Sequence, residues 1–473
     1  MNTNLHEKAS IGPTRLSRRR FFKAGSAAAA FTAASWSRVF GANERIGVGI
    51  IGFGLIGRIH TRNFLAQSDV DIVGVAETYR PRLQAAAELI GGKVAQYGDF
   101  RRLLENKAVD AVVVATPDHW HALMTMMACA AGKDVYVEKP LTLFVREGRW
   151  MVDVAWRYKR VVQVGTQQRS GAHYQTAREL IRGGRLGELV SVQCNFFRNV
   201  TPGFGSPPDG TPPPDLNYDL WLGPAPKRAY NPNRAIYHFR WFWDYSGGQM
   251  TNLGAHSLDA VHWITGTKGP LSVTSIGGRH FLKDNCEVPD VQDTLIEYPG
   301  FQTVCQFREC AAGFSKTGMG GLDFQGNKGT MSLHRDGYEI VSDKKENPTN
   351  ILARIIGGHP VGGPQPVAEP DPDDRFWTEP AKDASGDYKD QYVQHTRNFL
   401  DCIKSRHQPN SDLESSHRVA TVCHLANISL KTARKIRWDP EKEQIIADAE
   451  AAKMLVRPYR KPWDAELKAL GVS

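Results

Sequence analysis

The 473-residue sequence predicts an α/β protein with two domains, the first of which contains a doubly wound parallel sheet. Three observations lead to this prediction. Apolar runs alternate with helix-like stretches between residues 45 and 165, a glycine pattern at residues 52–57 follows the first run, and beyond residue 183 apolar residues recur at every second position. We therefore expect a second α/β domain with a large, mostly antiparallel sheet that leaves one face open.

The first domain is expected to alternate strands with helices. Residues 111–115 read Ala-Val-Val-Val-Ala, an apolar run that is typical of a strand buried on both faces of a parallel sheet. The expected strands are 45–51, 70–76, 111–115, 134–137 and 161–165, and the expected helices are 59–67, 81–90, 121–131 and 145–158.

The second domain is expected to begin after a helix at residues 174–182, which two glycines end. Alternation predicts strands, and two helices are expected to close the domain. Proline- and glycine-rich stretches predict long surface loops at 201–214 and 347–387. The strands are expected at 189–197, 271–278, 291–298, 303–308 and 330–334, and the helices at 392–404 and 417–435.

Residues 1–42 resemble an export leader. Residues 18–23 read Arg-Arg-Arg-Phe-Phe-Lys, which is similar to the twin-arginine signal that a bacterial export receptor reads. The small-residue stretch at 24–34 is shorter than the roughly 20 residues that span a bilayer, so we expect cleavage rather than an anchor. A basic arm without a signal function is the alternative. The leader indicates a periplasmic or otherwise exported protein.

The charge and cysteine content of the remaining chain exclude several classes of partner. Seven of the 59 basic residues and one of the 50 acidic residues precede residue 43, so the rest carries 52 against 49, a net charge of +3. This charge is too small to indicate nucleic acid or an anionic membrane as a partner. No other apolar run approaches a membrane span, so no stable membrane insertion is expected. The seven cysteines show no Cys-x-x-Cys spacing, which argues against a zinc site or a disulfide scaffold.

A glycine pattern between the first strand and the first helix predicts a dinucleotide site, because the N–H groups at the start of a helix can bind a pyrophosphate. Glu77 lies twenty residues after the last glycine, at the end of the second strand, where it can bond both ribose hydroxyls and would repel a phosphate. This favours NAD over NADP, although Arg82 lies close enough to weaken the preference. The pattern consists of Gly52, Phe53, Gly54, Leu55, Ile56 and Gly57.

Further segments make the chain resemble one family of oxidoreductases. They are 115–121 (Ala-Thr-Pro-Asp-His-Trp-His), 131–133 (Ala-Gly-Lys), 138–140 (Glu-Lys-Pro) and 247–259 (Gly-Gly-Gln-Met-Thr-Asn-Leu-Gly-Ala-His-Ser-Leu-Asp). With the glycine pattern, they are similar to the glucose-fructose oxidoreductase, inositol dehydrogenase and rhizopine catabolism (Gfo/Idh/MocA) family. The resemblance implies a Rossmann domain, an α/β domain whose open sheet forms a homodimer or homotetramer, and oxidation or reduction of a sugar or cyclitol hydroxyl with NAD or NADP.

The resemblance covers roughly residues 44–435 of the chain. Together with the predicted leader, it divides the chain into four segments: a leader at 1–42, a Rossmann domain at 43–166, a substrate and oligomerisation domain at 167–435, and a C-terminal extension at 436–473.

Oxidation of a secondary alcohol requires a base for the hydroxyl proton and a donor that holds the oxygen. By the resemblance, Lys139 of the Glu-Lys-Pro segment reaches the substrate oxygen and His256 is the acid/base. Where the family pattern has an aspartate four residues before this histidine, the chain has Asn252. An amide can orient the imidazole but cannot stabilise its cation, so we expect help from Asp259, three residues after His256.

The remaining predicted contacts divide between cofactor and substrate. Thr116, Pro117 and His121 follow a parallel strand, where ligands of open α/β sheets bind. The resemblance places this segment beside the nicotinamide ribose, and Glu138 and Lys139 complete the predicted cofactor contacts. Tyr237 begins an aromatic run that suits stacking on a sugar ring. The predicted substrate contacts are Gln167, Arg169, His173, Tyr237, Asn252 and His256, several of which are equally compatible with a place in the core or on the surface.

Three functions are compatible with the sequence. The leading hypothesis is an exported dehydrogenase with a tightly held NAD, since nicotinamide cofactors are made in the cytosol. The second is an NAD-dependent glycoside-cleaving enzyme that works by transient oxidation, elimination, hydration and re-reduction. The third is a non-catalytic sugar sensor of the same fold, which the amide at Asn252 keeps open.

Overall fold

The structure, a computed structural model, describes residues 45–312, 320–343 and 376–472. The predicted leader at 1–42 lies outside these ranges, as do residues 347–375 of the second predicted loop. Within the described ranges, no helix combines the length and apolar character that a bilayer crossing requires. All seven cysteines are free.

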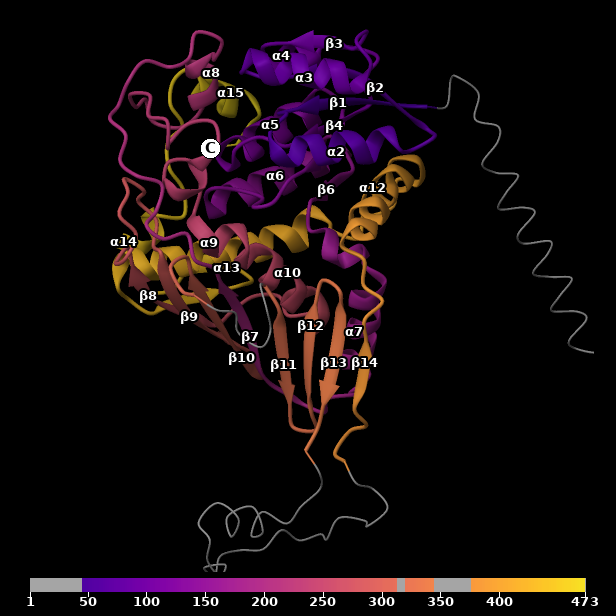
Figure 1. Ribbon diagram of the computed structural model, residues 1–473, viewed down its shortest axis with the longest axis vertical. Helices are drawn as coiled ribbons and strands as arrows, with labels where there is room; N and C mark the ends of the chain where they lie inside the picture. Colours follow the sequence, from indigo (N-terminus) through magenta and orange to yellow (C-terminus); the bar gives the residue numbers. More distant parts are fainter. Residues whose placement is uncertain (1–44, 313–319, 344–375, 473) are drawn as a thin grey trace, which may run out of the picture. The chain divides into compact units, whose positions relative to one another are not determined.

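Residues 46–164 contain a six-stranded sheet in which every pairing is parallel (Figure 1). The order β3-β2-β1-β4-β5-β6 grows outward in both directions from β1 and β4, which is the topology of a doubly wound fold. This confirms the predicted class of the first sheet. The strands are β1 (Ile46–Ile51), β2 (Val70–Ala76), β3 (Ala95–Tyr97), β4 (Ala111–Val114), β5 (Asp134–Val137) and β6 (Val162–Val164).

Helices cover both faces of this sheet, which explains its uninterrupted apolar strands. Val113 of β4 belongs to a core with Phe64 and Ala86, whereas the next residue, Val114, belongs to a core with Leu103 and Leu123. The helices are α2 (Leu55–Leu65), α3 (Arg80–Ile90), α4 (Phe100–Leu104), α5 (Asp118–Ala130) and α6 (Val145–Arg157). The sequence did not predict β3 and α4, because elements of three and five residues are too short to show a period.

The second sheet has ten strands in the order β14-β13-β12-β11-β7-β10-β9-β8-β15-β16. All neighbours pair antiparallel except β7 and β10, which are parallel. This confirms the mostly antiparallel second sheet. Its strands are β7 (Leu189–Phe197), β8 (Ser272–Gly278), β9 (Val291–Tyr298), β10 (Phe301–Arg308), β11 (Leu322–Gly326), β12 (Thr330–His334), β13 (Gly337–Val341), β14 (Ala381–Asp383), β15 (Ile436–Asp439) and β16 (Gln444–Ile445).

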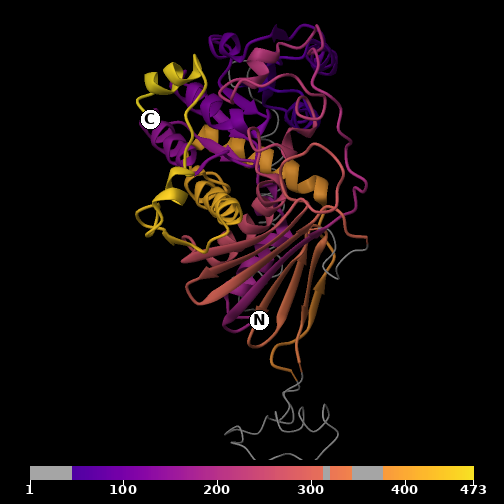
Figure 2. The same cartoon turned by 90° about the vertical axis from the view of Figure 1, so that its left-hand side faces the viewer.

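One face of this second sheet is covered by helices and the other is open (Figures 1 and 2). The covering helices are α7 (Ala172–Arg182), α10 (Gly254–Thr265) and α13 (Leu413–Thr432), and α13 also contacts α6 and β6 of the first sheet. Along β9, Thr294 and Ile296 are buried while Leu295 and Glu297 are exposed. The period of two in the sequence therefore reflects a sheet with one solvent face.

The remaining described elements connect or close the two sheets. The predicted loop at 201–214 contains neither helix nor strand beyond isolated bridges. Residues 436–445 add β15 and β16 to the edge of the second sheet, so the predicted extension begins as part of this sheet. The other elements are α8 (Tyr218–Leu222), α9 (Gly248–Asn252), α12 (Tyr388–Ser405), α14 (Ala449–Lys453), α15 (Trp463–Ala469) and the 3-10 turns η1 (Gln167–Ser170) and η2 (His238–Trp241).

Candidate active site

The three glycines of the loop after β1 have different surroundings. Gly52 has a φ of +91°, and a Cβ there would lie 2.7 Å from the carbonyl oxygen of Ala115. A Cβ at Gly57 would lie 2.2 Å from the carbonyl oxygen of Gly52, so close packing of α2 on β1 requires glycine. At Gly54 the nearest atom is Nη1 of Arg82, 3.7 Å away. The missing side chain at Gly54 therefore leaves open space, which close approach of a ligand requires.

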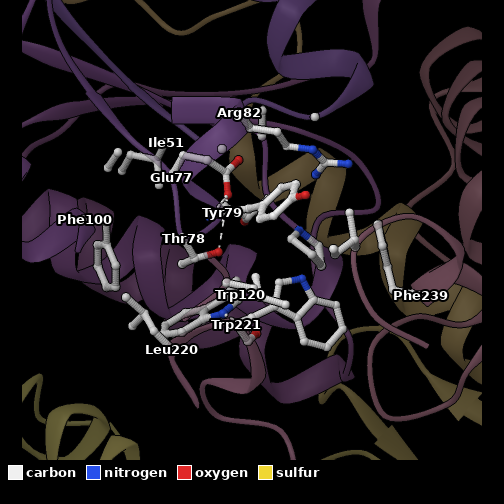
Figure 3. A pocket seen from close by; sticks show the side chains of 18 of the residues that line it. Ile51, Glu77, Thr78, Tyr79, Arg82, Phe100, Trp120, Leu220, Trp221 and Phe239 are labelled. Atoms are coloured by element: carbon white, nitrogen blue, oxygen red, sulfur yellow. Dashed lines mark hydrogen bonds between the residues drawn. The ribbon is translucent and has the colours of Figure 1, made fainter. Parts of the chain in front are cut away.

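A cleft of about 870 Å³ opens beside this loop (Figure 3). One wall is formed by the ends of β1, β2 and β4 and by the start of α5, and the opposite wall by residues 216–240, hereafter the cover segment. Most of its lining side chains are apolar or aromatic, which is typical of cofactor sites. The predicted cofactor-binding residues in the lining are Gly52, Gly54, Leu55, Ile56, Glu77, Arg82, Thr116 and Pro117.

The Glu77 carboxylate is fixed at the end of β2. Its Oε2 accepts a hydrogen bond from the N–H of Phe53 (2.8 Å), and its Oε1 accepts one from the N–H of Tyr79 (3.0 Å). The Thr78 hydroxyl also donates to Oε1 (3.3 Å). A carboxylate has about four acceptor positions, so one is left for a ribose hydroxyl. Arg82 lies in the same cleft (Figure 3).

The C-terminal end of β4 offers a polar atom without a partner. Thr116 lines the cleft, and its buried Oγ1 has no hydrogen-bond partner among the described residues. Because buried hydroxyls are rarely left unbonded, this atom fits a ligand group held in the cleft. Together with the open space at Gly54 and the Glu77 carboxylate, it makes the cleft a good fit for a dinucleotide.

His121 was predicted to contact the cofactor, but its ring nitrogens face two backbone carbonyls. Nδ1 lies 2.7 Å from the oxygen of Pro140, and Nε2 lies 2.9 Å from the oxygen of Thr116. His121 thus ties the segment after β5 to the end of β4, between the cleft and Lys139.

Lys139 follows β5 and reaches across to the end of α9. Its Nζ donates hydrogen bonds to the backbone oxygen (3.0 Å) and the side-chain Oδ1 (2.9 Å) of Asn252. Burial lowers the pKa of Lys139 to about 8. Arg240 and Arg335 also lower this pKa, whereas the charge of Glu138 opposes the shift. An amine with this pKa can take up and release a proton near neutral pH.

Asn252 orients the lysine and not the histidine, which corrects the expectation from the sequence. The Asn252 Nδ2 donates to Oε1 of Gln249 (3.1 Å), whose own Nε2 donates to Oε1 of Glu309 (2.6 Å). Both ends of the Asn252 amide are thereby engaged, and the orientation of its Oδ1 toward Lys139 is fixed.

His256, on the first turn of α10, is 6% exposed, and its buried Nδ1 has no hydrogen-bond partner among the described residues. Burial holds the pKa of His256 well below its usual range, and the positive charges of Lys139 and Arg335 lower it further. The imidazole is therefore neutral at physiological pH. A neutral imidazole carries one N–H donor and one acceptor nitrogen, which suits hydrogen bonding to a hydroxyl or carbonyl oxygen.

Asp259 and Arg169 pair with each other, which removes both from their predicted roles. Arg169 Nη2 lies 2.6 Å from Oδ1 and Nε 2.9 Å from Oδ2 of Asp259. A further Arg169 nitrogen donates to Ser415 Oγ (2.9 Å) and to the backbone oxygen of Asn410 (3.1 Å). Their side chains are only 2% and 1% exposed, so both are engaged in a buried ion pair and are not available to assist His256 or to bind substrate.

The other predicted substrate contacts also have protein partners or a different location. Gln167 Nε2 donates to Glu138 Oε1 (2.9 Å), and His173 Nε2 lies 3.0 Å from the backbone oxygen of His334. Tyr237 is 52% exposed and lines the cofactor cleft. The structure therefore brings together Lys139, Asn252 and His256, but not the remaining predicted substrate contacts.

Sequence reasoning missed two kinds of site residue. His60 of α2 bonds Glu138, with Nε2 2.7 Å from Oε1, and so fixes the carboxylate beside Lys139. Arg335, in the turn between β12 and β13, places a positive charge near Lys139 and His256. Neither residue belongs to a motif, and only the buried Glu138, which needs a partner, gave a signal. Within the described ranges, no group of three or more His, Cys, Asp or Glu side chains is placed to hold a metal ion.

Two family models match the chain. An oxidoreductase-family model for an NAD-binding Rossmann fold covers residues 46–166, and a model for the same family's C-terminal alpha/beta domain covers residues 205–277 and 382–465. The matched residues make up more than half of the chain. The first match confirms NAD as the cofactor for which the cleft is built.

Two curated relatives cover part of the chain. Rhizopine catabolism protein MocA of Rhizobium meliloti is 28% identical over 222 residues, which are 47% of this chain and 58% of the relative. Inositol 2-dehydrogenase 1 of Saccharopolyspora erythraea is 33% identical over 150 residues, 31% of this chain and 44% of the relative. The aligned parts thus span about half of each relative's length.

The fold is similar to solved structures of greater coverage. The WlbA dehydrogenase from Bordetella pertussis, solved in complex with NADH and UDP-GlcNAcA, matches with a TM-score of 0.59 at 19% identity. The match covers 84% of this chain and 99% of that protein. At this identity the likeness establishes the shared fold, and it agrees with the predicted fold class.

Proposed function

The chain belongs to the Gfo/Idh/MocA family of NAD-binding oxidoreductases, and we propose that it is an NAD-dependent dehydrogenase acting on a secondary hydroxyl of a sugar or cyclitol. One observation carries the proposal. A lysine with a pKa of about 8 and a buried, neutral histidine lie beside a cleft that fits a dinucleotide. The curated relatives include an inositol 2-dehydrogenase, which fits this class of substrate.

In the proposed chemistry the protein accepts the proton of the substrate hydroxyl and donates one hydrogen bond to its oxygen. Bound NAD supplies the hydride acceptor at the carbon that is oxidised. Lys139, as a neutral amine held by Asn252, accepts the hydroxyl proton. His256 donates a hydrogen bond to the same oxygen as it gains carbonyl character. This reverses the roles that the resemblance implied, in which His256 was the acid/base. The lowered pKa of His256 makes Lys139 the better proton acceptor of the two, since the imidazole resists protonation.

Contacts at the end of the chain favour a cofactor that stays bound. Arg460 donates from Nε to the backbone oxygen of Gly223 (2.9 Å) and from Nη1 to Asp219 Oδ1 (2.7 Å), and so holds the cover segment. The ring of Trp463 lies 4.8 Å from that of Trp120, which lines the cleft. Residues 457–472, hereafter the tail, therefore join the two walls of the cleft. A held cover agrees with a resident cofactor in the exported location that the leader predicts.

The open face of the second sheet supports a homo-oligomer as part of the proposal. Val190, Ile276 and Leu295, on three different strands, are 57%, 67% and 47% exposed. Exposed apolar side chains that gather on one sheet face are typical of protein interfaces. A homodimer or homotetramer formed through this face is the proposed assembly.

The same tail contacts favour a second candidate function, a glycoside-cleaving enzyme that oxidises, eliminates, hydrates and re-reduces its substrate. Such a cycle returns the hydride to the sugar, so it consumes no cofactor and benefits from one that does not dissociate. Incubation with aryl glycosides in heavy water separates the two functions. Aglycone release with deuterium next to the oxidised carbon indicates the closed cycle, whereas stoichiometric NADH with a keto-sugar indicates a dehydrogenase.

The experiment that tests the proposal replaces Lys139. Lys139→Ala is expected to lower kcat by about 100- to 10,000-fold, the usual contribution of a general base, while mass spectrometry finds the same content of bound NAD. Lys431→Ala is the matched control, because burial also lowers the pKa of Lys431 to about 8, against Trp243 and outside the cleft. Unchanged turnover in Lys139→Ala would refute the assigned role.

A further inference from the structure

The turn between β12 and β13 is held firmly at the end of the second sheet that faces the first (Figure 1). Gln391 Nε2 of α12 donates to the backbone oxygen of Arg335 (2.8 Å). His173 Nε2 of α7 lies 3.0 Å from the backbone oxygen of His334. Two helices thus fix the backbone from which the Arg335 side chain extends.

The Arg335 side chain rests on an aromatic pair that leads to the reacting centre. Its Cζ lies 5.0 Å from the centre of the Tyr388 ring, and the Tyr388 and Tyr392 hydroxyls are 2.9 Å apart. The Tyr392 ring is 6.2 Å from the ring of His60, which bonds the carboxylate of Glu138 next to Lys139. Stacking positions a guanidinium through its face and leaves its N–H donors at the edge free to bind a ligand.

Arg335 has no acidic partner in the described part of the chain. Among residues 45–312, 320–343 and 376–472, no carboxylate lies within ion-pair distance of the Arg335 guanidinium. Within the same ranges, the guanidinium donates no hydrogen bond. The acids nearest the reacting centre are already engaged: Glu138 by His60 and Gln167, and Asp118 by the hydroxyl of Ser246 (2.5 Å). A half-buried cation without a counter-charge favours an anion in its vicinity.

The position of this charge is consistent with a role at the substrate. Contacts through Tyr388, Tyr392 and His60 connect it to Glu138 beside Lys139, and its charge lowers the pKa of both Lys139 and His256. Arg240 also lowers the pKa of Lys139, but it lines the cofactor cleft and is available to the dinucleotide. Arg335 does not line this cleft, so binding of the cofactor does not account for its positive charge.

We propose that Arg335 binds an anionic group of the substrate, so that the enzyme acts on an acidic sugar and not on a neutral one. The inference rests on the proposed dehydrogenase function and names its substrate class. A guanidinium matches a carboxylate or a phosphate ester through two parallel hydrogen bonds, and both groups share this recognition chemistry. Tyr388 and Tyr392 position Arg335, while Lys139 and His256 act on a hydroxyl of the same sugar.

The test compares acidic and neutral sugars on the NAD-loaded enzyme. NADH formation is measured with glucuronate and galacturonate, with glucose and galactose as neutral counterparts, and with glucose 6-phosphate as the phosphate arm. Arg335→Gln is expected to lower kcat/KM for the preferred acidic sugar by about 10- to 100-fold, the usual loss for a charged hydrogen bond, and to change neutral sugars by less than about threefold. Arg335→Lys, which keeps the charge but loses the fork, should fall between the two.

Arg178→Gln is the matched control, because the Arg178 guanidinium also stacks on an aromatic ring, 4.8 Å from Trp263, outside the site. It should leave the acidic-to-neutral ratio unchanged. Preference for a uronate assigns Arg335 to a carboxylate, and preference for the phosphate ester assigns it to a phosphate. Equal loss with acidic and neutral sugars, or a neutral preference in the unmodified enzyme, overturns the inference while leaving a Lys139-dependent dehydrogenase intact. Failure of the proposed dehydrogenase function would instead appear as turnover that Lys139→Ala leaves unchanged.

Discussion

The cofactor cleft and the reacting centre lie next to each other but are assembled in different ways. Two of the three features that fit the cleft to a dinucleotide, the open space at Gly54 and the Glu77 carboxylate, come from one short stretch, residues 52–77, in which the carboxylate bonds the glycine loop. The reacting centre joins Lys139 to Asn252, which are 113 residues apart, and adds Arg335 from a turn of the second sheet. A site formed by one supersecondary unit can be predicted from a local sequence pattern, whereas a site formed between two domains depends on how the domains pack.

The largest expected effect is that of Gly54→Val, which alters the cofactor cleft alone. In Gly54→Val the new side chain meets no protein atom closer than 3.7 Å at its Cβ, so we expect the fold to survive. The side chain would occupy the space that close approach of the pyrophosphate requires, and bound NAD should fall below detection by mass spectrometry. Thermal unfolding of the cofactor-free protein measures whether stability is preserved.

Gly57→Val provides the contrast within the same loop. Its Cβ would lie 2.2 Å from the carbonyl oxygen of Gly52, so this variant should lose stability as well as NAD. Full NAD content in Gly54→Val would contradict the assignment of the cleft.

The fold was predictable where periodicity extends over several turns or residues. All five predicted strands of the first domain are present, because helices bury both faces and keep the strands apolar. The short strands β11 and β13 to β16 were missed, since two to five residues are too few to show a clear alternation. Their pairing is decided by neighbours far away in the sequence.

The candidate site was predictable in its residues but less so in their partners. The family pattern suggested that the Asn252 amide orients the imidazole of His256, but α9 ends at Asn252 and α10 begins at Gly254. The amide therefore points to Lys139. Asp259 does lie on the helix of His256, but it forms an ion pair with Arg169, which is 90 residues earlier in the chain. Contacts of this range leave no local pattern from which they could be read.

A smaller effect is expected where the tail holds the cover segment. Arg460→Ala removes the hydrogen bonds to Asp219 and to the backbone oxygen of Gly223, so the cover should open more often. Arg460 Nη2 also donates to the backbone oxygen of Asp219 (2.9 Å), so three hydrogen bonds are lost. Since such partly exposed bonds contribute about 1 to 2 kcal/mol together, NAD should dissociate about 5- to 30-fold faster. The measurement is the loss of bound NAD with time during gel filtration and dilution.

Arg434→Ala is the control for this change, because Arg434 pairs with Asp448 (2.8 Å) and Glu450 (2.9 Å) and has no contact with the cover segment. Equal rates of NAD loss in the two variants would show that the tail does not retain the cofactor.

The smallest expected effect is that of Asn252→Asp, which alters the reacting centre alone. In Asn252→Asp a carboxylate replaces the neutral Oδ1 that lies 2.9 Å from Nζ of Lys139, and an adjacent negative charge favours the ammonium form. The pKa of Lys139 should therefore rise from about 8. Oxidation needs the neutral amine, which exists above this pKa, so the rise of kcat/KM with pH should move upward by about 1 unit or more. Asn398→Asp adds the same charge outside the centre and keeps the acceptor that bonds the N–H of Asn410. An unshifted profile in Asn252→Asp, with NAD still bound, would mean that Lys139 is not the group that takes the proton.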